Sequence, residues 1–183
     1  MNKAVVILLL ALVLGTGATE RARAQGDGVT ESPDGQEAVK VYYTPEQALA
    51  KVFAKADSLW VETWQPTMAE LAAVEARLGW QVAPGPVQIH RGRQGEQDLG
   101  YAVITAENGR FKPITFLVKV DPDLQAEMVL VMVYRESRGD GVKRQRFLKQ
   151  FRKKGADSPL RLNRDIVGVS GATMSSRGVT AGV

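Results

Sequence analysis

Small and hydroxyl-bearing residues gather close to the C-terminal end of the chain, in the run Ser170-Gly171-Ala172-Thr173-Met174-Ser175-Ser176. We call this run (residues 170–176) the hydroxyl motif. The Thr173 hydroxyl can accept a phosphoester bond, and small neighbours leave room for a bulky phosphate. A helix that begins near Met174 would turn its unpaired N–H groups and positive dipole end toward that anion. Ser175 and Arg177 could add a hydroxyl donor and a positive charge.

The hydroxyl motif also fits a Ser/Gly-rich loop that caps a C-terminal helix, and Gly17-Ala18-Thr19 repeats its central tripeptide near the start of the chain. A second stretch carries more information. Glu136-Ser137-Arg138-Gly139-Asp140-Gly141, the glycine loop (residues 136–141), is followed by Phe147-Leu148-Lys149-Gln150-Phe151. Taken alone, the two glycines need no more than a strand-to-helix turn to explain them.

Together and in this order, the two stretches resemble the FMN-binding domain family over roughly residues 98 to 183. That family includes the flavin-carrying subunits of sodium-pumping quinone reductase and of its ferredoxin-linked relative. Its motif Ser-Gly-Ala-Thr-x-Thr/Ser-Ser carries FMN through the threonine, so the resemblance implies FMN as the cofactor, attached by a phosphoester bond to Thr173. The cofactor contacts that it implies are Ser170, Gly171, Ala172, Thr173 and Ser175 in the hydroxyl motif, and Ser137, Gly139 and Gly141 in the glycine loop.

The sequence departs from the family at one position. The family usually has an acidic residue three positions before the motif serine, which the flavin transferase that attaches FMN reads; here that position is Val167. Asp165 stands two residues earlier. Two expectations stay open: Asp165 substitutes through a longer local loop, or covalent attachment is weakened or absent.

The first 24 residues have the layout of a secretory signal peptide: Lys3, an apolar run from Ala4 to about Gly15, and the small-x-small site Ala22-Arg23-Ala24. The apolar run is short for a membrane span, which needs about 20 residues. We therefore expect cleavage after Ala24 and a periplasmic location, with an uncleaved membrane anchor as the alternative. Residues 25–38 are polar and glycine-rich and are predicted to form a flexible lead-in to one domain over residues 39–183.

Composition excludes several classes of protein. The chain has no cysteine, which excludes disulfides, iron–sulfur ligation and lipid attachment through cysteine. Loss of residues 1–24 removes three basic residues and one acidic residue, so the 24 basic and 20 acidic residues fall to 21 and 19, a net charge of +2. That small excess predicts no nucleic-acid partner. The excess is local, and its default interpretation is a solvated helix face, with an acidic protein or an anionic membrane as the alternative partner. The cations concerned are Lys143, Arg144, Arg146, Lys149, Arg152, Lys153 and Lys154.

The elements that must position these residues are predicted as an α+β fold. Capping boxes at Thr44 and Thr67 indicate helices over about 45 to 56 and from 67 to Gly79. From Val87 onward the apolar period changes to two, with the Asn-Gly pair at 108–109 as the best hairpin signal. Four strands joined by short turns predict an antiparallel meander covered on both faces by helices. The family resemblance adds strong curvature of that sheet. The strands are expected at 87–91, 99–104, 114–120 and 128–134, after a short strand-like stretch at 60–64.

Other chemistries find little support. The only histidine, His90, precedes Ser170, and the glycines around that serine are misplaced for a hydrolase nucleophile elbow. One histidine and no cysteine suit neither zinc nor copper, so we expect no metal site and no catalytic acid or base. Trp60, Trp64 and Trp80 are predicted to pack in the core.

The sequence thus predicts an exported FMN protein that passes electrons between redox partner proteins, which we expect to be membrane-bound. The cofactor would supply the chemistry. A flavin transferase would be the partner that attaches it. The alternative is a binding or assembly module that holds flavin reversibly or not at all.

Overall fold

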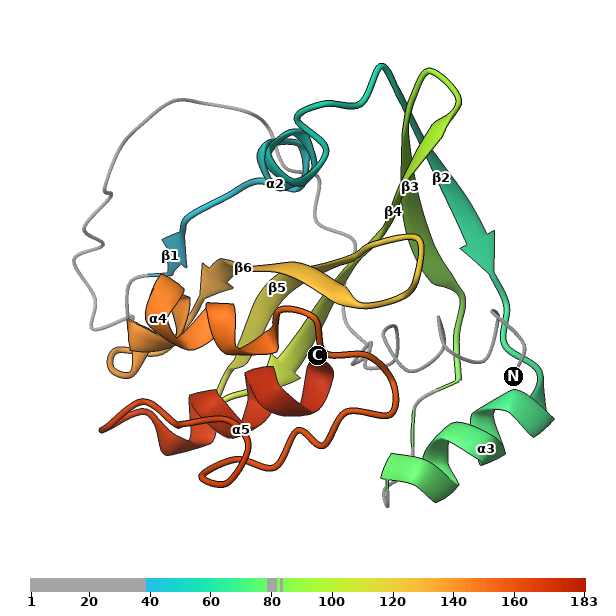
Figure 1. Cartoon of the computed structure of the whole chain (residues 1–183). Coiled ribbons are helices and arrows are strands. Elements are labelled where there is room, and N and C mark those ends of the chain that lie inside the picture. Colours follow the sequence, from blue (N-terminus) through green and yellow to red (C-terminus); the bar gives the residue numbers. More distant parts are fainter. Residues whose placement is uncertain (1–38, 79–81, 83) are drawn as a thin grey trace.

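The computed structural model describes residues 39–78, 82 and 84–183 (Figure 1). The predicted signal peptide (1–24) and lead-in (25–38), together with Gly79 and Trp80, lie outside the described residues. The strands are β1 (Lys40–Val41), β2 (Ser58–Trp64), β3 (Val87–Gln94), β4 (Gln97–Asn108), β5 (Pro113–Val120) and β6 (Ala126–Tyr134). The helices are α2 (Pro45–Val52), α3 (Met68–Leu78), α4 (Gln145–Leu148) and α5 (Thr173–Gly182), with short 3-10 turns η1 (Asp140–Lys143) and η2 (Lys149–Phe151) on either side of α4.

The predicted α+β class and antiparallel sheet are confirmed. One six-stranded sheet runs in the order β1-β6-β5-β4-β3-β2, and every neighbouring pair is antiparallel. The meander from β3 to β6 matches the prediction, with the strands between one and six residues longer than their predicted apolar runs. Strand β1 was not predicted, because two residues are too few for a periodic signal. It pairs with the end of β6 through Lys40 and Tyr134.

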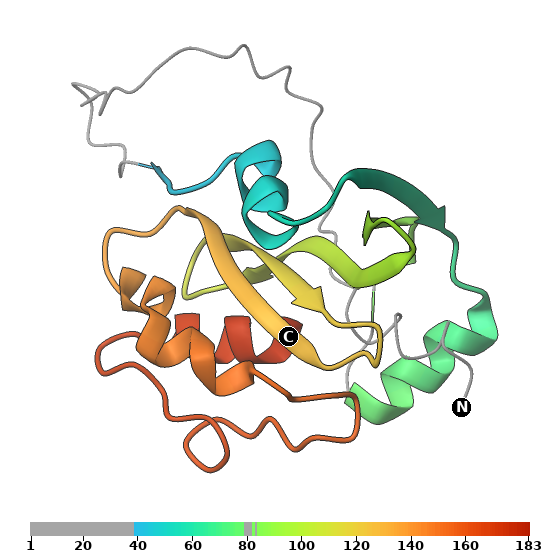
Figure 2. The ribbon, with the colours of Figure 1, turned by 45° about the horizontal axis from the view of Figure 1, so that its top comes forward.

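The centre of the sheet is covered on both faces, as its nearly continuous apolar strands predict. Figures 1 and 2 show α2 on one side of β5 and β6, with α4 and α5 on the other. On the α2 side, Leu117 packs with Leu49 and Phe53. On the α5 side, Phe116 packs in a larger cluster with Val179. Alternate residues of β5 thus serve opposite cores, which fixes the strand's register.

Both predicted capping boxes form. The Thr44 hydroxyl accepts from Gln47 N at 3.2 Å, and the Gln47 side chain accepts from Thr44 N at 3.0 Å. Thr67 and Glu70 make the same reciprocal pair at the start of α3. Helix α2 ends at Val52 rather than near residue 56, because Phe53 leaves the helical conformation and packs into the core.

The expectation that the tryptophans pack in the core is wrong for Trp60. Its ring lies against the guanidinium groups of Arg91 and Arg93, and its indole N–H donates to Glu62 at 2.9 Å. Trp60 therefore belongs to a surface cluster on β2 and β3. Trp64, in contrast, packs against the small apolar cluster that contains Val87.

Candidate functional site

The glycine loop and the hydroxyl motif, about thirty residues apart in sequence, lie against each other. Gly139 has φ +92°, and a Cβ there would stand 3.2 Å from both Ala172 Cβ and Ser175 Oγ. A Cβ at Gly141 would stand 2.9 Å from Val169 Cγ1, just before the motif. Glycine is therefore needed at position 139 by the backbone conformation and at both positions by the closeness of the second loop.

Tyr134, the last residue of β6, joins the two loops. Its side chain is fully buried, and its hydroxyl donates to Arg138 O at 2.5 Å. The same hydroxyl lies 2.9 Å from Ser175 Oγ. Burial raises the pKa of Tyr134 despite the hydrogen bond with Ser175, so the phenol stays protonated in neutral solution. The sequence analysis did not single out this residue, because a tyrosine at the end of an apolar strand carries no separate signal.

Asp140 anchors the glycine loop to the edge of the sheet. Its Oδ2 accepts from Tyr42 Oη at 3.1 Å and from the ammonium groups of Lys40 and Lys143, each at 3.3 Å. Desolvation raises the pKa of Asp140, but the hydrogen bonds from Lys143, Tyr42 and Lys40 together lower it below its usual value. The carboxylate therefore stays ionised and holds three donors. Asp140 belongs to the glycine loop in the sequence, but its pattern there predicts no role for it.

The hydroxyl motif divides into an exposed half and a buried half. Ser170, Gly171 and Thr173 are exposed, whereas Ala172 and Ser175 are buried. Gly171 has φ +75°, and among the described residues no heavy atom beyond its chain neighbours lies within 4 Å of the position that its Cβ would take. The buried half is structural: Ser175 contacts Tyr134, and Ser176 Oγ accepts from Val169 N at 3.0 Å.

Helix α5 begins at Thr173, one residue before the predicted start, and its N-cap Ala172 makes no side-chain capping bond. Within the described part of the chain, its first turn is therefore open to an external acceptor. The residues fit a phosphate: an exposed threonine hydroxyl, first-turn N–H groups and the exposed Arg177 one turn further on. The expected contacts Ser170 and Gly171 lie in the exposed half, and Ser137 is exposed on the glycine loop. Ser175 already has Tyr134 as partner, and its role as a cofactor contact stays a prediction.

Val167 and Asp165, which precede the hydroxyl motif, have different hydrogen-bond partners. The Gln150 side-chain amide accepts from Val167 N at 2.8 Å and donates to Val167 O at 3.0 Å. The Val167 side chain is left 71% exposed. The Asp165 carboxylate instead accepts from Arg161 Nε at 2.7 Å and Arg161 N at 3.1 Å, which closes a separate turn. Hydrogen bonds with Arg161 lower the pKa of Asp165.

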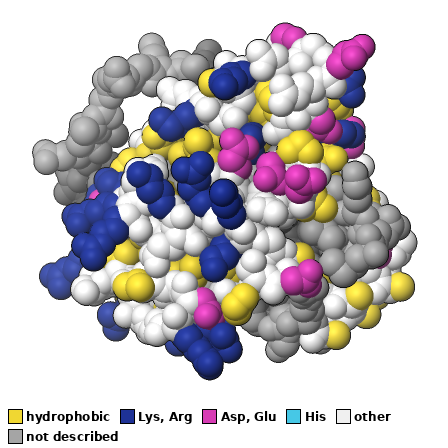
Figure 3. All heavy atoms as spheres, viewed as in Figure 1, with side chains coloured by type: hydrophobic (Ala, Val, Ile, Leu, Met, Phe, Trp, Pro, Cys, Tyr) yellow, Lys and Arg dark blue, Asp and Glu magenta, His cyan; other side chains and the backbone are white. Residues whose placement is uncertain are grey.

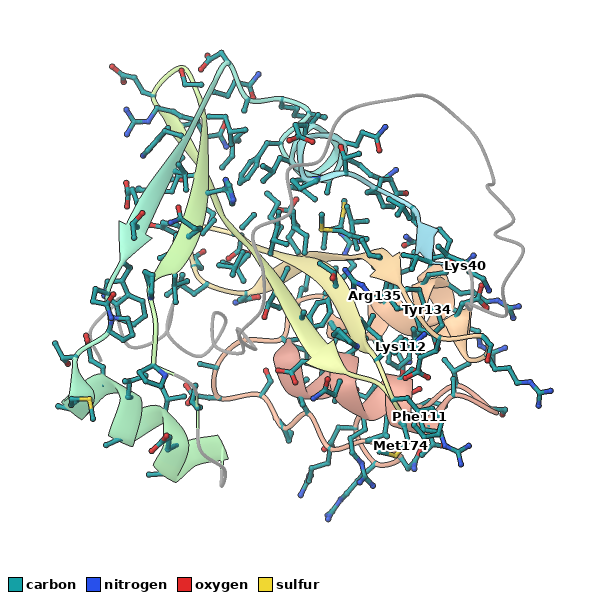
Figure 4. The ribbon with its side chains drawn as sticks, turned by 180° about the vertical axis from the view of Figure 1, so that it is seen from behind. Lys40, Phe111, Lys112, Tyr134, Arg135 and Met174 are labelled. Atoms are coloured by element: carbon teal, nitrogen blue, oxygen red, sulfur yellow. The ribbon has the colours of Figure 1, made fainter. Side chains whose placement is uncertain are left out.

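An exposed aromatic ring lies at the same end of the molecule. Figure 4 shows Phe111 and Met174 at the end that also holds Tyr134, and both are exposed, at 78% and 42%. Glu136 fixes this hairpin tip to the glycine loop, because its buried carboxylate accepts from Phe111 N at 2.8 Å and Lys112 N at 3.2 Å. The Arg110 guanidinium lies 4.9 Å from the centre of the Phe111 ring. Apolar and cationic groups are thus combined here, as an aromatic cofactor with a phosphate requires.

The predicted basic face is confirmed as an exposed surface over α4 and η2. Figure 3 shows Lys and Arg side chains gathered on the face of the molecule that carries α4. Phe147, Leu148 and Phe151 are buried beneath it, and the Phe147 and Phe151 rings meet edge to face. Only Lys143 of these cations forms an ion pair with a described residue, Asp140.

Comparison with known proteins agrees with this geometry. Residues 109–183 match the family model of the FMN-binding domain. Residues 109–183 are therefore similar to an FMN-binding domain, and the match indicates FMN as the cofactor. The fold is similar to that of NqrC from Shewanella oneidensis, with a TM-score of 0.50 and 18% sequence identity over 72% of this chain and 78% of NqrC. A comparison with curated proteins found no match.

Among the described residues, neither a histidine nor a metal-binding cluster belongs to the site. His90 lies on β3, and burial lowers its pKa. Among the described residues, no group of three or more His, Asp or Glu side chains could hold a metal ion. None of the helices in that part of the chain is both long and apolar enough to cross a membrane.

Proposed function

We propose that this chain is an exported electron-transfer flavoprotein that carries FMN on a phosphoester bond to Thr173 and exchanges electrons with membrane-bound redox partner proteins. One observation carries the proposal. Within a matched FMN-binding domain, the Thr173 hydroxyl is exposed at an uncapped helix start and is surrounded by small residues. When bound, FMN supplies the redox chemistry.

The protein's own groups have three tasks in this proposal. The first-turn N–H groups of α5 and Arg177 hold the phosphate. Gly171 keeps the approach to Thr173 open, because no described residue occupies the position that its side chain would take. Tyr134 and Asp140 keep the glycine loop against the motif, so that the cofactor meets a preformed surface.

Export and membrane-bound partners rest on the signal-peptide layout of residues 1–24 and on the resemblance to the quinone-reductase subunits. A covalent tether has a purpose in such a protein, since a chain exported unfolded cannot bring a loosely bound flavin with it. The flavin transferase that would attach FMN acts after export in this account.

A second candidate function is reversible flavin binding without a covalent link, in a binding or assembly module. Val167 favours it, because an apolar side chain stands where the family usually has an acid. Asp165 is engaged by Arg161 and is not free to replace it. In that case the exposed Thr173 hydroxyl would donate a hydrogen bond to the phosphate rather than form an ester with it.

The experiment that tests the proposal is purification of the exported protein, followed by its visible spectrum and its intact mass. We expect flavin absorbance, a mass that begins at Gln25 and the added mass of one FMN that survives denaturation. Flavin that separates from the denatured protein, with the mass of the bare chain, would instead support reversible binding. A colourless protein would contradict both candidate functions.

A further inference from the structure

A pocket of about 580 Å³ opens beside the hydroxyl motif, between the end of β4 and helix α5. Met174 and Arg177 line it from α5, and Leu160 and Leu162 line it from the preceding loop. Glu107 contributes a carboxyl group from β4. Met174, which follows Thr173, thus lines the same pocket as Glu107, a residue outside both the hydroxyl motif and the glycine loop.

Two glycines bring α5 onto Glu107. A Cβ at Gly178 would stand 2.4 Å from Asn108 O, and a Cβ at Gly182 would stand 2.7 Å from Glu107 Cγ. These contacts are shorter than real Cβ atoms tolerate, so larger residues at either position would lift the helix off the strand. The Glu107 carboxyl is consequently held beneath the helix, with Oε1 3.3 Å from the Gly182 Cβ position.

The Glu107 side chain has no hydrogen bond or ion pair within the described part of the chain. Burial raises its pKa to about 7, since removal from water disfavours the carboxylate. The charged groups that line its pocket are Arg177 on α5 and Arg161 on the loop, and Arg161 is already paired with Asp165. On the strand side its partner in β5 is the apolar Ile114.

We propose that Glu107 is the proton-exchanging group of the flavin site, giving a proton to the reduced cofactor through this pocket and recovering it from water. The inference rests on the proposed function. Glu107 suits the task because its carboxyl is half-buried, has no competing partner among the described residues and shares the pocket with the turn that follows Thr173.

The proton balance is simple. The electrons come from a redox partner protein, and Glu107 is neither oxidised nor reduced. Its O–H bond breaks as the proton leaves, which gives a carboxylate beside Arg177. A proton from water at the pocket mouth then restores the neutral acid. Reoxidation of the cofactor by an acceptor protein would run the same exchange in reverse.

The test combines two measurements on the full-length protein. The first is a carboxyl ¹³C NMR titration of the FMN-free protein labelled at glutamate, with Glu107→Gln to assign the Glu107 signal. The second is the midpoint potential of the FMN-loaded protein, measured from about pH 5 to about pH 9 so that the range brackets neutrality. The matched control is Glu96→Gln, at an exposed turn between β3 and β4.

We expect the Glu107 signal to titrate near neutral pH rather than near 4.5. We also expect the potential to change its pH slope in the same range in wild type and in Glu96→Gln, and this break to be lost in Glu107→Gln. Potential curves that superimpose for wild type and Glu107→Gln would overturn this inference alone, as would an ordinary titration. Absence of FMN from all three proteins would overturn the proposed function and this inference with it.

Discussion

The hydroxyl of Tyr134 lies 2.9 Å from Ser175 Oγ and thereby joins the last residue of β6 to the first turn of α5. The same hydroxyl donates to Arg138 O, so a single buried side chain holds both the glycine loop and the hydroxyl motif. Because Gly139 leaves no space for a Cβ beside this hydroxyl, the three groups form one packed junction. The exposed Thr173 is positioned by this buried junction two residues away.

Loss of the Tyr134 hydroxyl should weaken the junction. We expect Tyr134→Phe to cost about 1–3 kcal/mol in the free energy of unfolding, because it leaves the buried Ser175 hydroxyl and Arg138 O without this partner. Urea unfolding measures it, with Ser175→Ala and the double variant completing a cycle. The double variant should cost less than the two single changes added together. Strict additivity would mean that the two hydroxyls do not interact.

Asp140 should stabilise the protein only where it is ionised. Its pKa is lower in the folded protein than the usual 3.8, so its contribution is present above that value and is lost as pH falls through the folded pKa. For a partly exposed group, we expect Asp140→Asn to cost about 0.5–1 kcal/mol at pH 6. The difference from wild type, measured by thermal unfolding, should shrink at pH values well below 3.8. A cost that does not change with pH would exclude the ionised carboxylate as its cause.

Glu107 should have the opposite pH dependence. Its pKa is raised from 4.5 to about 7 on folding, so the folded protein binds more protons in that range and loses stability as pH rises through it. Glu107→Gln removes this penalty. With an allowance for solvent screening at the open side of the pocket, the variant should be about 1–2 kcal/mol more stable than wild type at pH 8. Near pH 4 the two should be equal in urea unfolding. A variant without any advantage at pH 8 would show that the carboxyl is well solvated.

Gly139 and Gly171, two of the glycines with positive φ, should differ in their tolerance to substitution. Gly171 faces open space, so Gly171→Ala should cost only the backbone strain of about 1 kcal/mol. Gly139→Val adds a Cβ 2.7 Å from Tyr134 Oη to a similar strain and should cost about 3 kcal/mol or more. Comparison of the two midpoints in urea tests this difference. Similar small costs would show that the loops can separate freely.

The fold could be predicted to a large extent from the sequence, because its signals are local. The capping boxes at Thr44 and Thr67 and the hairpin at Asn108 involve residues within a few positions of each other. Burial on both faces of β5 could be predicted from its unbroken apolar run. Strand β1 could not, since its pairing with Tyr134 depends on a residue more than ninety positions away.

The site was predictable only in part, for the same reason. The hydroxyl motif and glycine loop could be read from the sequence, but their contact depends on Tyr134, whose partners Arg138 and Ser175 come from different segments. Glu107 carries no motif, and its environment arises only when α5 lies on β4. Packing of segments distant in sequence determines both features.

The central claim is the phosphoester bond between FMN and Thr173. Val167 is the residue that argues most strongly against it, because the family usually has an acid at that position. Thr173→Ala removes one exposed threonine hydroxyl, and Thr63→Ala removes another on β2, outside the motif, as a matched control. Val167→Asp introduces a carboxylate at an exposed position whose backbone N–H and C=O are hydrogen-bonded to the Gln150 side chain. All four proteins, wild type included, should be produced together with a flavin transferase.

The most direct measurement is flavin fluorescence of these denatured proteins on a gel. We expect fluorescence in wild type and in Thr63→Ala, none in Thr173→Ala, and a signal in Val167→Asp at least as strong as in wild type. Fluorescent Thr173→Ala would contradict the assigned tether. A dark wild type beside a fluorescent Val167→Asp would contradict covalent attachment in this protein and leave reversible FMN binding as its function.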